Sequence, residues 1–287
     1  MPGKRCRKNR PKIPNIVVVS DTHVGCRLAL MAPDGAALDD GGKVMPSTLQ
    51  LKIWEQWEQF WGEVVPGWVD GEPFYVVHNG DAVDGTHHNA TTQWSHNLED
   101  QAEHAYQILK PVVELCEGRY YHIRGTEAHI GKSGVEEERL AKRLGAIPNE
   151  HGQFARWELW KRLDGDNGGL IHFLHHIGTT SSSAHETSAI NAELAAMYAD
   201  AGRFGDEPPK VVVRSHRHQS AEIRLPTIGG YASCFVTAAW QLKTPYVWKI
   251  SGARVRQPQL GGSLVRLGTS ELHTQHHVVR MQRSREE

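Results

Sequence analysis

The sequence has few cysteines, no long apolar run and almost no net charge. Its four cysteines lie far apart among 287 residues and form no Cys-x-x-Cys pair, which argues against a thiolate zinc site and a disulfide framework. No apolar run approaches the roughly 20 residues that span a bilayer, so no membrane partner is expected. A formal net charge of −1 argues against a protein that binds nucleic acid through its overall charge.

The N-terminus is the one strongly basic segment. Residues 1–13 contain six lysines and arginines but lack the apolar core of a signal peptide, so we predict a disordered tail and a cytoplasmic protein. Residues 14–283 show no internal repeat and no clear linker, which favours one domain whose C-terminal part is rich in β-structure. The sequence does not predict the oligomeric state.

Histidine is unusually frequent, with 18 residues against 32 lysines and arginines. Metal ligation and proton transfer are the two specialised uses of this side chain. The positions where histidines gather are therefore the first places to look for a site.

Several segments carry clear secondary-structure patterns. Ser47 and Gln50 form a capping box before a helix with apolar residues at helical spacing. A second helix is expected over residues 99–117, kinked or broken near Pro111, and others over 135–144 and 184–201. Residues 154–163 and 170–174 flank a turn-rich segment typical of a hairpin, and short strands are expected after Tyr231.

Five short apolar runs end in polar clusters. They span residues 16–19, 74–77, 120–123, 170–174 and 211–213. Alternation of such strands with helices predicts an α/β fold, in which ligands bind beyond the carboxyl ends of the strands. The five clusters are therefore expected to converge on one site.

Two of these clusters carry carboxylates. Asp21-x-His23 follows the first run, and Gly80-Asp81-x-x-Asp84 follows the second. Alone, the first motif is common by chance, and the second also fits a simple turn. Glycine allows the chain to turn sharply after a strand and to approach an ion closely. Asp81 can then bridge two cations, while Asp84 orients a neighbouring ligand.

Two further clusters carry histidine pairs. His216-x-His218 follows the last run, and His175-His176 follows the fourth. An isolated pair fits surface residues equally well. After strands that meet at one edge, however, these imidazoles lie where they can bind metal ions.

The ordered set of motifs resembles the calcineurin-like metallophosphoesterases, over residues 16–218. That resemblance implies a four-layer αββα sandwich with a two-metal centre at the strand ends. It implies that Asp81 bridges the two ions and that either His175 or His176 contributes, with His175 preferred because it directly follows the strand. The implied ligands of the first ion are Asp21, His23 and His218, and those of the second are His175 and His216.

The third cluster departs from the family pattern. The family has Gly-Asn-His followed by an acid, whereas this chain has Gly125-Thr126-Glu127-Ala128-His129. Thr126 or Glu127 therefore stands where the asparagine ligand is expected, and Glu127 is the better ligand for a hard cation. This variant resembles phosphoesterases of bacteriophages and prophages, which would place the protein in the host cytoplasm.

The resemblance implies a hydrolase that cleaves phosphoesters, with phosphodiesters favoured by family habit. Two divalent ions about 3.5–4 Å apart neutralise the phosphate and supply a bound hydroxide. The oxygen and nitrogen ligands suit Mn, Fe, Zn or Ni without choosing among them. The expected general acid is His129, paired with Asp84; His87 and His88 are the competing candidates. Nucleic acid and nucleotides are candidate substrates.

Two other interpretations stay open at this stage. In one, the Thr126 change has removed the second metal and the protein is a non-catalytic module that binds nucleic acid or a protein partner. In the other it is a protein phosphatase. Gly85 stands where an arginine directly after Asp84 would be expected of a protein phosphatase, which counts against that interpretation.

Overall fold

The computed structural model describes residues 12–87, 90–131, 133–163, 168–178, 182–249, 256–269 and 271–281. Residues 1–11 of the predicted tail, the candidate acid His88 and the hairpin turn at 164–167 lie outside these ranges. Within them, every helix is too short or too polar to cross a bilayer.

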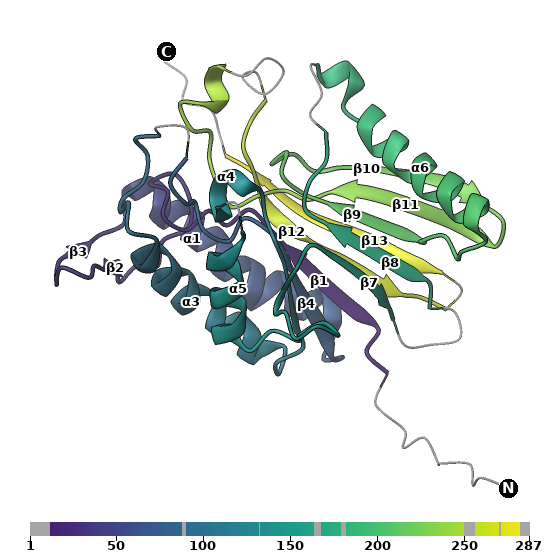
Figure 1. The fold of residues 1–287 in the computed structure, drawn as a ribbon, viewed down its shortest axis with the longest axis horizontal. Coiled ribbons are helices and arrows are strands. Elements are labelled where there is room, and N and C mark those ends of the chain that lie inside the picture. The colour runs from purple at the N-terminus through teal and green to yellow at the C-terminus, as the bar shows by residue number, and fades with distance from the viewer. Residues whose placement is uncertain are drawn as a thin grey trace, which may run out of the picture.

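Two β-sheets form the centre of the molecule (Figure 1). The first has the order β13-β12-β1-β4-β5-β6, and its members β1, β4 and β5 run parallel. Its strands are β1 (Asn15–Val19), β4 (Phe74–Asn79), β5 (Tyr120–Ile123), β6 (Ala155–Arg156), β12 (Gln259–Leu267) and β13 (Leu272–Arg280).

The second sheet has the order β10-β11-β9-β8-β7, with β8 and β9 parallel. Its strands are β7 (Glu158–Arg162), β8 (Leu170–Leu174), β9 (Val211–Arg214), β10 (Ala221–Thr227) and β11 (Gly230–Val236). The short strands β2 (Ala36–Ala37) and β3 (Lys43–Val44) pair separately.

Helices cover the outer faces of both sheets. Those on the side of the first sheet are α1 (Thr48–Gln59), which continues through η1 (Phe60–Val64) into α2 (Val65–Val69), together with α3 (Leu98–Leu115) and α5 (Val135–Leu144). On the opposite side lies α6 (Ser188–Phe204) (Figure 1). The short elements are α4 (Glu127–Ile130), η2 (Ser183–His185) and η3 (Val247–Lys249).

Three apolar cores separate the four layers, because successive side chains of a strand point to opposite faces. In β1, Val17 and Val19 face the helices of the first sheet, while Ile16 and Val18 face the second sheet. In β9, Val212 turns outward to the core beneath α6. The α/β class and the four-layer αββα sandwich expected from the sequence are thereby confirmed.

Local patterns were predicted with varying success. The capping box at Ser47 is present, and β7 pairs with β8 as the hairpin pattern indicated. The sequence predicted a kink or a break near Pro111; the break is wrong, because α3 continues to Leu115. Buried apolar residues on both sides of the proline hold that helix against the sheet. The last strands are longer than expected, with nine residues each in β12 and β13.

Candidate metal centre

The loops that follow the parallel strands meet at one edge of the sandwich. The loop after β1 is tied to the loop after β4, since the backbone N–H of Asp21 donates to Gly80 O at 2.9 Å and that of His23 to Asp81 O at 3.1 Å. In the second sheet, Ser215 N donates to His175 O at 2.8 Å. Between the two sheets, Asn79 Nδ2 donates to Ser215 Oγ at 2.7 Å, and this bond brings the polar clusters of both sheets together.

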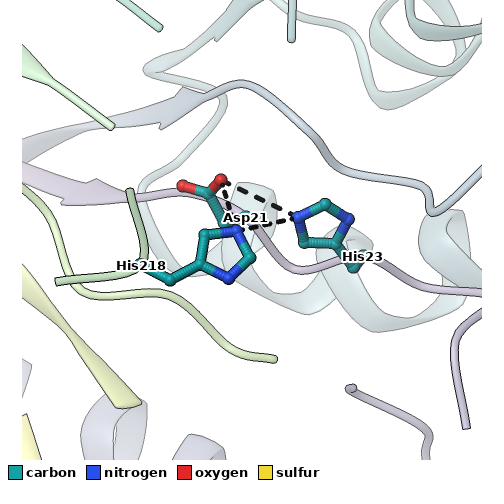
Figure 2. A group of neighbouring side chains, drawn as sticks. All are labelled: Asp21, His23 and His218. Atoms are coloured by element: carbon teal, nitrogen blue, oxygen red, sulfur yellow. Dashed lines mark hydrogen bonds and ion pairs between the residues drawn. The ribbon is translucent and has the colours of Figure 1, made fainter. Parts of the chain in front are cut away.

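The first group of ligand candidates consists of Asp21, His23 and His218 (Figure 2). His218 Nε2 lies 3.1 Å from Asp21 Oδ1 and 3.1 Å from His23 Nε2. Two nitrogens bound to one tetrahedral ion at about 2.1 Å are separated by about 3.4 Å. The observed spacing of the two rings is therefore close to that of ligands on a shared ion.

The second group consists of Asp81, His175 and His216. His175 Nε2 lies 3.0 Å from Asp81 Oδ2. His175 Nδ1 donates to the backbone oxygen of Asn79 at 2.6 Å, which leaves Nε2 as the nitrogen that can bind an ion.

Asp21 Oδ1 is the atom through which the two groups approach each other. It lies 3.8 Å from His23 Nε2 in the first group and 3.9 Å from His175 Nε2 in the second. Asp21 Oδ1 and His175 Nε2 are both buried and make no hydrogen bond of good geometry, although His218 Nε2 lies 3.1 Å from the first atom and Asp81 Oδ2 lies 3.0 Å from the second. Buried polar atoms are rarely left unpaired, so this pair of atoms fits a cation between them.

The backbone is strained at the candidate ligands. Among the described residues, seven other than glycine have a positive φ, and five of these are ligand candidates. A left-handed conformation costs a non-glycine residue about 1–2 kcal/mol, and such strain gathers at functional sites. The five are Asp21, His23, Asp81, His216 and His218.

Two glycines allow the loops to come this close. A Cβ on Gly80, whose φ is +93°, would lie 2.5 Å from His175 Nδ1. A Cβ on Gly125 would lie 1.9 Å from Asp81 Oδ1. Any side chain at either position would therefore push a ligand candidate out of place.

Asp84 supports the first group from behind. Its Oδ1 lies 3.3 Å from His23 Nδ1, which directs the Nε2 of that ring toward Asp21 and His218. The carboxylate itself accepts from Gln93 Nε2 at 2.6 Å and from Gln241 Nε2 at 3.2 Å. The sequence motif predicted an orienting role for Asp84, but not the two glutamines, which are distant from it in sequence or follow no motif.

His129 lies over both groups. Its Nδ1 donates to the backbone oxygen of Asp84 at 2.6 Å, and its Nε2 is 3.9 Å from Asp81 Oδ2. Burial lowers the pKa of His129 to about 4. His129, His23 and Asp84 also form a third group with ligand spacing, but the bond to the Asp84 carbonyl takes up the His129 nitrogen that faces it.

The third cluster places Thr126, and not Glu127, against the carboxylates. Thr126 N donates to Asp81 Oδ1 at 2.7 Å, and its Oγ1 lies 3.3 Å from Asp81 Oδ2. The side chain of Glu127 is exposed at the start of α4. Its predicted role as a ligand is therefore not supported by contacts with either group among the described residues.

The two adjacent histidines after β8 point in different directions. His175 is buried, whereas His176 is exposed and contacts the His216 ring with 4.7 Å between ring centroids. Since successive side chains near a strand end alternate between faces, only His175 enters the second group.

Glu137 is a buried residue of the site region that the sequence analysis missed. From α5, its Oε1 accepts from Ala82 N at 2.9 Å and its Oε2 from Gly125 N at 2.6 Å. Those backbone groups adjoin Asp81 and Thr126, so the carboxylate ties the loops after β4 and β5 together. In the sequence, Glu137 is one of three consecutive glutamates on a charged helix, and no local pattern distinguishes it.

Charge interactions keep the carboxylates ionised. Burial raises the pKa of Asp81 and Asp84, but the neighbouring histidines hold both well below the usual range. Burial lowers the pKa of His23, but hydrogen bonds with Asp21 and Asp84 raise it overall to about 10. The pKa of His175 is likewise raised to about 9, chiefly by Asp81 against the opposing effect of burial. An ion that binds here therefore displaces protons from histidines.

A cavity of about 760 Å³ opens over the two groups. Its floor includes His23, Asp81 and His175, and His129 lies in its wall. The ligand candidates are therefore accessible to a molecule much larger than a phosphate ion.

Comparisons with known proteins give a likeness of fold alone. No family model matches the chain, and no curated protein matches it. Among solved structures, it is similar to vacuolar protein sorting 29 from Cryptosporidium parvum, with 8% identity, a TM-score of 0.35 and coverage of 94% of this chain and 100% of that one. A metallophosphoesterase from Sphaerobacter thermophilus has 13% identity and a TM-score of 0.37, with 94% and 89% covered. At such values these likenesses carry no argument about function.

Proposed function

We propose that this chain is a metal-dependent phosphoesterase of the calcineurin-like metallophosphoesterase superfamily, with two divalent ions in its site and phosphodiesters as its favoured substrates. The observation that carries the proposal is the convergence of six Asp and His side chains from two sheets, five of them on a strained backbone. A fold has no need to concentrate strain at five buried or half-buried polar residues unless their placement serves a ligand.

The donor atoms fit divalent transition metals. Both groups offer carboxylate oxygen and imidazole nitrogen without thiolate, a set that suits Mn, Fe, Zn or Ni. When bound, two such ions neutralise phosphate charge and lower the pKa of a bound water. Asp21, His23 and His218 would hold one ion, and Asp81, His175 and His216 the other.

The remaining residues act on the substrate and on the ligands. Asp84 keeps the His23 ring in the orientation that an ion requires. His129 donates its Nδ1 proton to a backbone oxygen, and burial lowers its pKa to about 4, so the ring gains a second proton, on Nε2, only when a nearby anion such as a bound phosphate raises that pKa. That proton is placed for transfer to the departing oxygen of a phosphoester.

The test is hydrolysis of bis(p-nitrophenyl) phosphate by protein purified with Mn, with p-nitrophenyl phosphate as the monoester comparison. We expect turnover that chelation abolishes and added Mn restores, and faster turnover of the diester. Asp81→Asn protein is the negative control for contaminating hydrolases. A folded, metal-loaded protein that cleaves neither ester would overturn the proposal.

One observation favours a second candidate, a non-catalytic binding module. Thr126, a poor neutral ligand, occupies the place beside Asp81 where the family has asparagine. If the second ion does not bind, metal analysis will give about one ion per chain and no turnover. The two measurements together therefore separate the candidates.

A further inference from the structure

The wall of the cavity above the two ligand groups is rich in cationic side chains. Apart from the ligand candidates and the other histidines, its charged residues are Arg124, Arg217, Lys243, Arg256 and Glu127. Two of the cations have acidic partners outside the cavity: Arg124 pairs with a glutamate at 3.2 Å and Arg256 with another at 3.5 Å. Outside the ligand groups and the histidines, the lining thus contains four cationic side chains and one acidic side chain, although the whole chain has a net charge of −1.

Trp157 is an aromatic side chain of this wall with no role in the apolar cores. It stands between β6 and β7, 56% of it is exposed, and it belongs to none of the three cores. A single exposed aromatic residue is common on protein surfaces, so the informative observation is that Trp157 lines the cavity that also contains the ligand candidates.

Arg124 holds the indole in a fixed place. Its guanidinium lies 5.0 Å from the centroid of the Trp157 ring. The same guanidinium donates to Ala155 O at 2.9 Å and to Ser133 O at 3.1 Å. The ring is thereby backed by an anchored planar cation on one side, while more than half of its surface faces solvent.

The cavity is also too large for a phosphate group alone. A volume of about 760 Å³ falls within the range of sites that enclose a whole small molecule, about 300–1,000 Å³. Tyr246, which is 51% exposed, adds a second aromatic ring to the lining. The occupant that matches these features has an anionic group and a flat aromatic part.

We propose that the cavity binds a nucleoside phosphodiester, with the phosphate over the two ligand groups and a base stacked on Trp157. Bases stack on aromatic rings regardless of their sequence, and nearby arginines add cation–π and phosphate contacts. The reaction part of this inference rests on the proposed function, whereas the stacking part does not. A mononucleotide ester and a single strand share this chemistry, and the experiment separates them.

The first experiment compares two substrates with the same leaving group: the p-nitrophenyl ester of thymidine 5′-phosphate and methyl p-nitrophenyl phosphate. For Trp157→Ala, the ratio of kcat/KM values, nucleoside over methyl, should fall about 10- to 100-fold, as loss of one stacked base predicts. Trp157→Phe should keep most of the ratio. An unchanged ratio in Trp157→Ala overturns the inference.

Trp160→Ala is the matched control. Trp160 is also an exposed tryptophan, at 44%, and lies three residues further along, but it packs on His172 and does not line the cavity. The ratio should be unchanged in this variant. An equal fall in both variants would mean that general damage to β7, and not stacking, explains the result, and it would overturn the inference.

A binding experiment keeps this inference separate from catalysis. Metal-loaded protein is titrated with a fluorescent dT strand, an abasic strand of equal length, and a fluorescent thymidine nucleotide. Stacking is supported if either probe with a base binds more tightly than the abasic strand and if Trp157→Ala removes this difference. This result supports stacking even when no ester is cleaved, and in that case only the proposed function fails. Tighter binding of the dT strand would identify a single strand as the occupant of the cavity, and tighter binding of the nucleotide would identify a mononucleotide ester. Equal binding of all probes overturns the inference.

Discussion

The two ligand groups are supported in different ways. The ring of His23 in the first group is fixed by the Asp84 side chain, which two glutamines hold in turn. The second group depends on Glu137, which ties together the backbone beside Asp81 and Thr126. The first group is therefore organised by side chains already directed at its ligands, whereas the second is organised by the relative position of two loops.

This difference predicts unequal metal affinities. A carboxylate orients His23 in the first group, whereas a backbone oxygen orients His175 in the second group, and Thr126, a poor metal ligand, lies beside Asp81 there. Each contact that orients a ligand typically contributes about 10- to 100-fold in metal affinity. We therefore expect the first ion to bind more tightly than the second, and the following changes test that order.

The largest effect is expected from Asp81→Asn, which removes a buried charge next to His175. If Asp81 bridges, both ions should be lost, together with activity, and metal analysis of purified protein should fall from about two ions to none. Asp21→Asn is the partner variant, because Asp21 Oδ1 approaches both groups. If Asp81→Asn keeps the first ion while Asp21→Asn loses both ions, Asp21 is the residue that bridges them.

The next largest effect concerns His129. His129→Ala should slow alkyl phosphoesters about 10²- to 10⁴-fold, because their leaving groups need a proton. It should affect p-nitrophenyl esters little, because that leaving group departs as a stable anion. Metal content should not change. Equal loss on both substrates with metal retained would instead indicate phosphate positioning, and lost metal would make His129 a ligand. His87→Ala is the comparison, since His87 Nε2 lies 3.6 Å from Asp84 Oδ1.

Glu137→Gln should produce an intermediate effect. The amide keeps one acceptor, but its NH₂ group faces a backbone N–H that needs an acceptor, so the loops beside Asp81 and Thr126 should shift. The second ion should weaken about 10- to 100-fold while the first keeps its affinity. Titration calorimetry with Mn measures both. Glu136→Gln is the control, because Glu136 pairs only with Arg139 among the described contacts; an equal loss in both variants would contradict the assignment.

The smallest effects are expected in the third cluster. Thr126→Asn places an amide oxygen, a better metal ligand than a hydroxyl, beside Asp81 and should strengthen binding of the second ion, measured by Mn titration. Glu127→Gln should have little effect, because the side chain is exposed. A selective loss of the second ion in Glu127→Gln would instead support the sequence-based prediction that Glu127 is a ligand.

The sequence predicts the parts of the site that follow strand ends. A β-branched run followed by Asp or His is a local signal, and parallel strands then bring such clusters to one edge. The choice between His175 and His176 as the ligand candidate became firm only with the structure, in which His175 is buried. The side chains that fix the ligands could not be predicted. Gln241 and Glu137 act through contacts between segments far apart in the chain, and Gln93 lies in a loop without a recognisable motif.

The fold follows the same division. Core strands and the capped first helix were predicted because short continuous apolar runs and a period-3.6 pattern are local signals. The continuation of α3 through Pro111 was not, because packing of the helix against the first sheet offsets the local preference. Likewise, the lengths of β12 and β13 depend on pairing with each other over nine residues.

The left-handed backbone creates a conflict between thermal stability and metal binding. It lowers stability at the same five positions where it places the ligand candidates: Asp21, His23, Asp81, His216 and His218. Glycine at any of them would relieve about 1 kcal/mol of strain, whereas a β-branched residue would add to it. A library selected only for resistance to heat should therefore enrich glycine at these five codons and lose metal binding. A library selected for metal retention should tolerate the strain and find its stabilising changes elsewhere in the chain.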